Sequence, residues 1–270
     1  MLVDVGDTRL DVTERGSGDP VLVLHGGPGL DHTEFGHWLD PLPFRLLLVD
    51  LREQGRSDRG TPPSTWTVAQ MAADVDALSD ALGLERFAVL GHSFGAFVAL
   101  RHALDGARRP VGTIVSGGVP AEHWLDVDLS GADPVVAASF EREATVATHE
   151  DVLAVLRDQL PFHFADPADP RQADLMAAMA EGRMSPEVLR HGDYGDLDVE
   201  DRLGEITHPV LVLAGRHDRI TTAAAAEAIA AGVPGAELVV LERSAHMGFV
   251  EEPDGYRGAV EAFLRRTFAT

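Results

Sequence analysis

Residues Gly91–Gly95 read GHSFG, directly after the short apolar run Phe87–Leu90 and directly before a helical pattern at Ala96–Leu104. A serine in a sharp turn between a buried strand and a helix occupies a strained backbone position. The flanking glycines are needed because side chains there would clash. Such a turn exposes the hydroxyl of Ser93 and points a helix N-terminus at it, which favours developing negative charge. The stretch therefore predicts a strand–serine–helix turn that carries a nucleophile.

Further apolar runs, separated by Gly, Pro and helical patterns, extend this arrangement along the chain. Thr8–Glu14 alternates like an exposed strand, whereas continuous runs occur at Val21–Leu24, Leu46–Val49 and Val111–Val115. Later in the chain, Val210–Ala214 and Glu237–Leu241 also read as strands. Continuous runs are typical of strands buried on both faces of a parallel sheet. Helical patterns alternate with them at Thr67–Leu82, Thr222–Ala231 and Asp254–Phe268. The alternation predicts an α/β fold with a mainly parallel sheet flanked by helices.

The strand–helix alternation breaks near Pro120 and returns at Pro209. The segment between them is rich in Ala, Asp, Glu and Pro, and its helical stretches lie around Val135–Thr148, Asp151–Leu160 and Arg171–Ala180. We therefore expect a core domain made of residues 1–119 and 209–270, and an inserted helical cap made of residues 120–208. A cap of this length has room for about four or five helices of ordinary size.

A serine nucleophile needs a base, and the base needs an acid that orients it. Asp218 lies in the loop after Val210–Ala214, and His246 lies in the loop after Val239–Leu241. The carboxyl ends of parallel strands share one edge of a sheet, so these residues can converge with Ser93. The chain order Ser, Asp, His is the order in which nucleophile, acid and base follow one another in proteins whose nucleophile lies in such a strand–serine–helix turn. We predict Ser93, Asp218 and His246 as the catalytic residues.

Competing assignments exist for the acid and the base. An acid within Val119–Asp126 could replace Asp218, which would then be a solvated loop residue. His217 is a second candidate base, but it precedes the acid and is badly placed to reach it. We expect His25 and His92 to fix loops by hydrogen bonds rather than act as bases.

The glycine-rich loop His25–Gly29 (HGGPG) directly follows the run Val21–Leu24. Backbone N–H groups in such a loop can approach a reacting oxygen without interference from side chains. We predict that the N–H of Gly27 and the N–H of Phe94 form an oxyanion hole. Removal of one such donor typically costs about 10²- to 10³-fold in rate.

These elements together resemble the α/β-hydrolase fold superfamily over nearly the whole chain outside residues 120–208. The HGGPG loop, followed by D-x-R-x-x-G-x-S at Asp50–Ser57, resembles the proline iminopeptidase group in particular. The resemblance implies an α/β-hydrolase fold and a serine hydrolase. The chain departs from that group at Phe94, where the group has Trp, and at Glu53, where it has Gly. Its cap lacks the group's Trp-rich segment with glutamates that bind a free amino group, and Glu141 and Glu143 are candidates by residue type alone.

Composition excludes several classes of partner and site. Asp plus Glu number 44 against 22 Lys plus Arg, a formal net charge of −22, and the chain has no Lys and no Cys. Such an acidic chain lacks the basic surface that binds nucleic acid or an anionic membrane. Without Cys there are no disulfides and no thiolate nucleophile or ligand. The N-terminus does not read as a signal peptide, and no apolar stretch approaches the length of a membrane span, so we expect a cytoplasmic protein.

No cofactor or metal is expected. The remaining histidines are scattered without metal-ligand spacing, and no G-x-G-x-x-G or phosphate loop follows a strand. A dehalogenase or epoxide hydrolase would need Asp at position 93 and is not supported.

The sequence predicts a serine hydrolase that cleaves an ester or amide bond of a small molecule or short peptide through an acyl-enzyme. One alternative is an aminopeptidase releasing N-terminal proline, and another is a non-catalytic small-molecule receptor on the same fold. The oligomeric state stays open.

Residues 120–205 hold 20 acidic and 6 basic residues, a net charge of −14. The acidic residues gathered in this segment form either a solvated surface or an electrostatic field that attracts cationic substrates.

Overall fold

A single mainly parallel sheet organises the computed structural model, which describes residues 1–125, 127–191 and 196–270. Across these ranges the sheet has eight strands in the order β1-β2-β4-β3-β5-β6-β7-β8. The strands are β1 (Leu2–Asp4), β2 (Arg9–Gly16), β3 (Pro20–Leu24), β4 (Arg45–Val49), β5 (Ala88–His92), β6 (Gly112–Ser116), β7 (Val210–Gly215) and β8 (Glu237–Leu241). The pairs β1–β2 and β2–β4 are antiparallel, and the pairs from β4 to β8 are parallel. The predicted mainly parallel sheet is confirmed.

Both faces of the sheet are covered because side chains alternate along each strand. In β3, Leu22 and Leu24 pack with α1 (Val68–Ala81) and α2 (Phe94–Asp105). Val21 and Val23 point to the opposite face, where α9 (Pro253–Ala269) and the short α8 (Gly248–Glu251) pack. On the first face, β6 and β7 are covered by α7 (Ala223–Gly232). These two apolar layers explain why the strands read as continuous hydrophobic runs.

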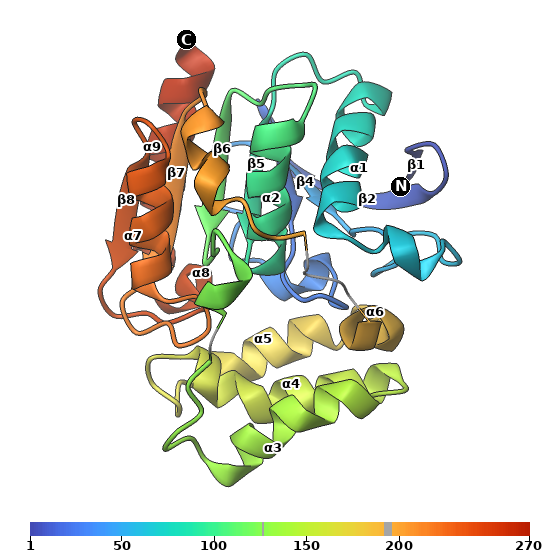
Figure 1. Ribbon diagram of the computed structural model, residues 1–270, viewed down its shortest axis with the longest axis vertical. Helices are drawn as coiled ribbons and strands as arrows, with labels where there is room; N and C mark the ends of the chain where they lie inside the picture. Colours follow the sequence, from blue (N-terminus) through green and yellow to red (C-terminus); the bar gives the residue numbers. More distant parts are fainter. Residues whose placement is uncertain (126, 192–195) are drawn as a thin grey trace.

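The inserted segment forms helices at one end of the sheet (Figure 1). Its α-helices in the described residues are α3 (Pro134–Arg142), α4 (His149–His163), α5 (Arg171–Met179) and α6 (Pro186–His191). The predicted helical stretch Val135–Thr148 is not a single helix, because α3 ends at Arg142. Thr148 is the N-cap of the next helix, α4, where it exchanges hydrogen bonds with Asp151. Short 3₁₀ turns complete the described chain at η1 (His32–Phe35), η2 (Pro63–Thr65), η3 (Glu122–Trp124), η4 (Glu143–Thr145) and η5 (Glu200–Glu205).

The division into a core of residues 1–119 and 209–270 and a cap of residues 120–208 stays a prediction. The final part of the inserted segment packs on the sheet side, because Leu203 and Ile206 share an apolar cluster with β7 and α7. Side chains of α4 and α5 join the cluster on the α9 face of the sheet. The inserted helices therefore rest directly on the sheet domain.

Candidate active site

Ser93 lies in a strained turn between β5 and α2. Its φ of 51° is in the left-handed region, which is unusual for a residue with a side chain. A Cβ on Gly91 would overlap the carbonyl oxygen of Gly95, and a Cβ on Gly95 would overlap that of Leu24. The turn is held by the Ser93 N–H, which donates to the carbonyl of Ser116 on β6 over 2.9 Å. This geometry places Ser93 at the N-terminus of α2, as the motif predicts.

His246 and Asp218 meet at the same edge of the sheet. The loop after β8 carries His246, and its Nδ1 donates to Oδ2 of Asp218, in the loop after β7, over 2.8 Å. Asp218 Oδ1 accepts the backbone N–H groups of Ile220 and Thr221 at 2.8 and 3.0 Å. The Thr221 hydroxyl donates to Asp218 Oδ2 over 2.9 Å and lies 3.2 Å from His246 Nδ1. Asp218 is thus a fully bonded acceptor that fixes one tautomer of His246.

Burial and charge act in opposite directions on this pair. Burial alone would favour the neutral forms, but the ion pair is stronger. The pKa of Asp218 is lowered despite its burial, because His246 and the backbone N–H groups stabilise its charge. The pKa of His246 is raised despite its burial, because the Asp218 carboxylate favours the imidazolium. The Asp218 carboxylate therefore stabilises the imidazolium that forms when His246 accepts a proton.

Two of the competing candidates for the base and the acid are exposed, in contrast with the buried pair Asp218 and His246. His217 is exposed on the surface. Glu122, in the alternative acid segment Val119–Asp126, is also exposed, and Asp126 lies outside the described residues. His92 is buried beside the site, where its ring centroid is 5.0 Å from that of His246 and its Nδ1 is 3.3 Å from the Ser116 hydroxyl.

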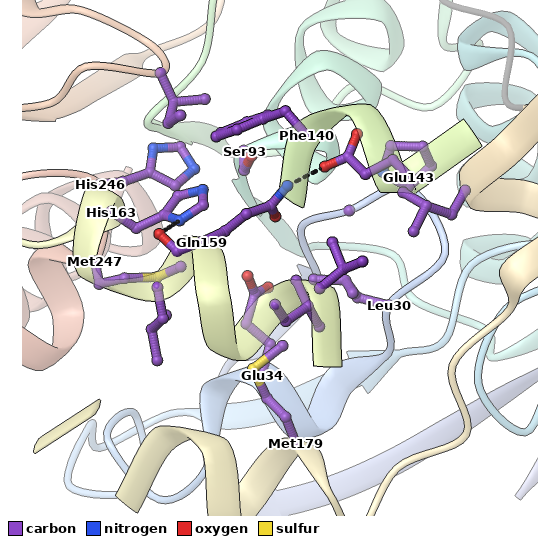
Figure 2. Close-up of a pocket in the computed structure, with 17 residues that line it drawn as sticks. Leu30, Glu34, Ser93, Phe140, Glu143, Gln159, His163, Met179, His246 and Met247 are labelled. Carbon is purple, nitrogen blue, oxygen red and sulfur yellow. Dashed lines mark hydrogen bonds between the residues drawn. The ribbon is translucent and has the colours of Figure 1, made fainter. Parts of the chain in front are cut away.

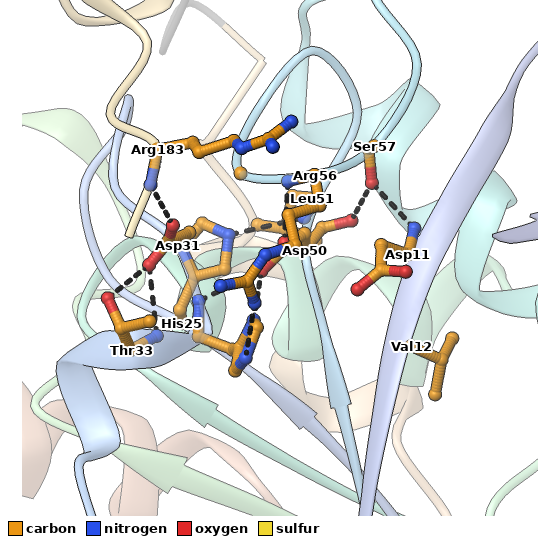
Figure 3. Close-up of polar contacts among 12 residues, drawn as sticks. Asp11, Val12, His25, Asp31, Thr33, Asp50, Leu51, Arg56, Ser57 and Arg183 are labelled. Atoms are coloured by element: carbon orange, nitrogen blue, oxygen red, sulfur yellow. Dashed lines mark hydrogen bonds and ion pairs between the residues drawn. The ribbon is translucent and has the colours of Figure 1, made fainter. Parts of the chain in front are cut away.

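His25 orients the glycine-rich loop after β3. Its Nδ1 donates to the carbonyl of Gly26 over 2.6 Å, and its Nε2 accepts the N–H of Leu51 over 3.2 Å (Figure 3). The Gly26 carbonyl belongs to the same planar peptide as the Gly27 N–H. Within residues 1–125, 127–191 and 196–270, that Gly27 N–H has no protein acceptor. His25 is therefore a loop-fixing donor in this structure, and it sets the direction of the Gly27 N–H.

Buried carboxylates hold the surrounding loops. Asp31 accepts the N–H groups of Thr33 and of Arg183 from the inserted segment (Figure 3). Asp50, the first residue of D-x-R-x-x-G-x-S, accepts Nδ1 of His32 over 2.6 Å and the N–H of Arg56 over 2.7 Å. Through Asp50, the motif therefore holds the loop that follows β3 in place by hydrogen bonds.

The same motif is anchored to the rest of the sheet domain. The Ser57 hydroxyl donates to the Asp50 carbonyl over 2.6 Å and accepts the N–H of Asp11 on β2 over 2.9 Å. Arg52 is fully buried and ion-paired with Asp74 and Asp7. These contacts give the motif a structural role in this chain.

A cavity of about 160 Å³ opens at Ser93 and His246. About half of its wall is formed by leucine, isoleucine, valine, methionine and phenylalanine side chains from α3, α4, α5, α6 and the loops of the sheet domain (Figure 2). The polar side chains on the wall are Glu34, Ser93, Glu143, Gln159, His163 and His246. The inserted segment therefore forms part of the same cavity as the predicted nucleophile and base.

Three of these polar groups, Glu34, Gln159 and His163, were not singled out from the sequence. Glu34 is almost fully buried, accepts the Gly26 N–H over 2.6 Å, and has a pKa raised to about 7 by burial. His163 ends α4, and its ring centroid lies 5.4 Å from that of His246. Glu143, a candidate by residue type, lines the cavity beside Gln159, whereas Glu141 is exposed. These positions depend on contacts between segments far apart in the sequence, so no local pattern marks them.

Among the residues that the structure describes, no cluster of three or more His, Cys, Asp or Glu side chains is arranged to hold a metal ion. The same residues include no helix that is both long and apolar enough to cross a membrane.

Comparison with known proteins agrees with this architecture. The model of the alpha/beta hydrolase fold family matches residues 19–253. A proline iminopeptidase of Levilactobacillus brevis is 26% identical over 280 residues, covering 96% of this chain and 91% of that protein. The crystal structure of a Mycobacterium smegmatis proline iminopeptidase superposes with a TM-score of 0.77 at 25% identity, over 99% of this chain and 98% of that one.

An esterase of Exiguobacterium antarcticum has the same fold, with a TM-score of 0.78 at 24% identity over 98% of this chain and 99% of that one. The protein belongs to the α/β-hydrolase fold family. The predicted fold class and the resemblance to proline iminopeptidases are confirmed, and the enzyme class of the family is that of hydrolases.

Proposed function

We propose that this protein is a serine hydrolase in which Ser93, His246 and Asp218 cleave an ester or amide bond through an acyl-enzyme. The observation that carries the proposal is the bond from His246 Nδ1 to Asp218, beside a serine in a strained turn on the same cavity. Because Nδ1 carries the proton that Asp218 accepts, Nε2 of neutral His246 has a lone pair available as a base.

In the first half of the reaction, the Ser93 hydroxyl attacks the substrate carbonyl carbon and its proton passes to His246 Nε2. The N–H groups of Gly27 and Phe94 stabilise the oxyanion. The carbon–leaving group bond then breaks, and the leaving group takes the proton from His246. In the second half, a water gives a proton to His246 Nε2 and attacks the carbonyl carbon of the acyl-enzyme. The bond from that carbon to Ser93 Oγ then breaks, Oγ takes the proton back from His246, and the acid is released.

The cavity supports a small substrate or the end of a short peptide. Its volume of about 160 Å³ is close to that of a cavity that holds a benzene-sized group. The inserted helices supply much of the wall, so we assign residues 120–208 as the cap that selects substrates. A mostly apolar wall favours an apolar acyl or leaving group.

Replacement of Ser93 by Ala tests the proposal. We expect kcat for a p-nitrophenyl ester of a short acid to fall by up to about 10⁶-fold. Ser64→Ala is the matched control, because Ser64 is exposed in the short turn η2. Ester hydrolysis by the Ser93 variant at the parent rate would refute the mechanism. Absence of ester and amide hydrolysis in the parent would favour the non-catalytic receptor.

The second candidate is an aminopeptidase that releases N-terminal proline. The position of Glu143 on the cavity wall favours it, because a carboxylate there could pair with a substrate ammonium group. The net charge of −14 on residues 120–205 would also raise the local concentration of a cationic substrate. Proline and alanine naphthylamides should then be cleaved with a kcat/KM that falls as ionic strength rises. No cleavage of either amide would exclude this candidate.

A further inference from the structure

His163 is a cavity residue that the proposed mechanism leaves without a role. It ends α4 of the cap, and its imidazole lies beside that of His246 on the side of the cavity next to Ser93 (Figure 2). The two ring centroids are 5.4 Å apart with an interplanar angle of 47°. The backbone also joins them, because the His246 N–H donates to the His163 carbonyl over 3.0 Å. His163 is thus fixed relative to the proposed base.

The hydrogen bond of His163 defines its tautomer. Its Nδ1 lies 3.1 Å from the carbonyl oxygen of Gln159, one turn earlier in α4. A carbonyl oxygen only accepts, so Nδ1 carries the proton and Nε2 of the neutral ring carries a lone pair. Among the described residues, Nε2 of His163 has no hydrogen-bond partner. Burial, with the adjacent His246 charge, lowers the pKa of His163 to about 4, so the ring is neutral at neutral pH.

The side of the cavity on which His163 lies determines what it can contact. The oxyanion is expected near Gly27, in the loop after β3, whereas the leaving group departs beside His246, which must protonate it. A hydrogen-bond acceptor next to His246 therefore faces the leaving-group atom. An ester oxygen there has no hydrogen to donate, but the nitrogen of a secondary amide does.

We propose that His163 is a specificity-determining residue whose Nε2 accepts a hydrogen bond from the scissile N–H, which extends the activity of this site to secondary amides. The inference rests on the proposed serine hydrolase function. As the C–N bond breaks, the nitrogen lone pair takes the proton from His246, and the nitrogen's own hydrogen stays bonded to nitrogen and points to His163. No proton passes to His163. Without this acceptor, the N–H beside His246 would lose its hydrogen-bond partner in a mostly apolar cavity, which is unfavourable.

The test uses three substrates with one acyl group: a p-nitrophenyl ester, a p-nitroanilide and its N-methyl anilide, which has no N–H. We expect the parent to cleave the anilide, and His163→Phe to lower the ratio of anilide to ester kcat/KM by about 10- to 100-fold. His163→Gln offers a side-chain carbonyl and should restore the ratio to within about threefold of the parent. The ratio of N-methyl anilide to ester should be the same in all three proteins.

Several results would overturn the proposal. One is an equal loss of ester and anilide cleavage in His163→Phe, which would show a structural role next to His246. Another is an unchanged ratio, and a third is a parent that cleaves the ester but not the anilide. A parent that prefers the N-methyl anilide would also overturn it, without any variant. Failure of the proposed function is separate, because it would appear as ester cleavage that survives Ser93→Ala.

Discussion

Glu34 gives a quantitative prediction, because it is a carboxyl buried in the cavity wall and not part of an ion pair with Lys or Arg in the described residues. Its Oε2 accepts the Gly26 N–H over 2.6 Å, and Oε1 lies 3.8 Å from Nε2 of His92. Burial raises its pKa from 4.5 to about 7. Glu34→Gln keeps an oxygen that can accept the Gly26 N–H but removes the ionisation. The Glu34→Gln substitution therefore isolates the effect of the buried charge on the free energy of unfolding.

The sign follows from proton linkage. A folded-state pKa above the unfolded value means that the folded chain binds more protons than the unfolded chain between about pH 4.5 and 7. The free energy of unfolding contributed by Glu34 is therefore largest at low pH and falls as pH rises through this window. For a shift from 4.5 to about 7, the loss between pH 5 and pH 8 is about 2.5 kcal/mol. The Gln variant has no such loss.

Urea unfolding followed by tryptophan fluorescence at pH 5, 6, 7 and 8 measures the effect. The free energy of unfolding of Glu34→Gln minus that of the parent should rise by about 2.5 kcal/mol from pH 5 to pH 8. Glu85→Gln is the matched control, because Glu85 is exposed, and its difference from the parent should stay nearly constant. A difference for Glu34→Gln that is independent of pH, or that falls with pH, would show that the pKa of Glu34 is not raised in the folded protein.

Three further substitutions test the site and its supports. Asp218→Asn should lower kcat by about 10⁴-fold with intact folding, because the base loses its orienting acceptor, and a loss below tenfold in ester assays would contradict this. Thr221→Val removes the hydroxyl that donates to Asp218 and should lower the free energy of unfolding by about 1–3 kcal/mol. An unchanged urea midpoint would argue against that contact. Arg52→Met leaves Asp74 buried without its main partner and should cost about 3–5 kcal/mol in the same assay, whereas a cost below about 1 kcal/mol would show that the ion pair contributes little.

The fold was largely predictable because the sheet is buried on both faces. Runs such as Val21–Leu24 and Val210–Ala214 have no polar side because helices pack on each face of their strands. The first strand, Leu2–Asp4, was not predicted, because a three-residue edge strand with an exposed Leu2 has no buried pattern. The short helix α6 was also missed, because six residues are too few for a helical period to be recognised.

The candidate site was predictable to the extent that strand ends mark it. Ser93 and Asp218 follow the buried strands β5 and β7, and His246 follows the edge strand β8. The parallel sheet brings the ends of these strands to one edge. Glu34 and His163 lie in η1 and at the end of α4, where no local pattern distinguishes a cavity residue from a surface residue. Their positions follow from how the inserted helices rest on the sheet domain.

Covalent labelling with a fluorophosphonate, followed by peptide mass mapping, shows whether Ser93 is the nucleophile. The reagent reacts with an activated serine and reports the nucleophile without knowledge of the natural substrate. We expect one adduct per chain, on the peptide that contains Ser93, and much slower labelling in His246→Ala. No adduct, or an adduct at another residue with Ser93 unmodified, would show that Ser93 is not the activated nucleophile.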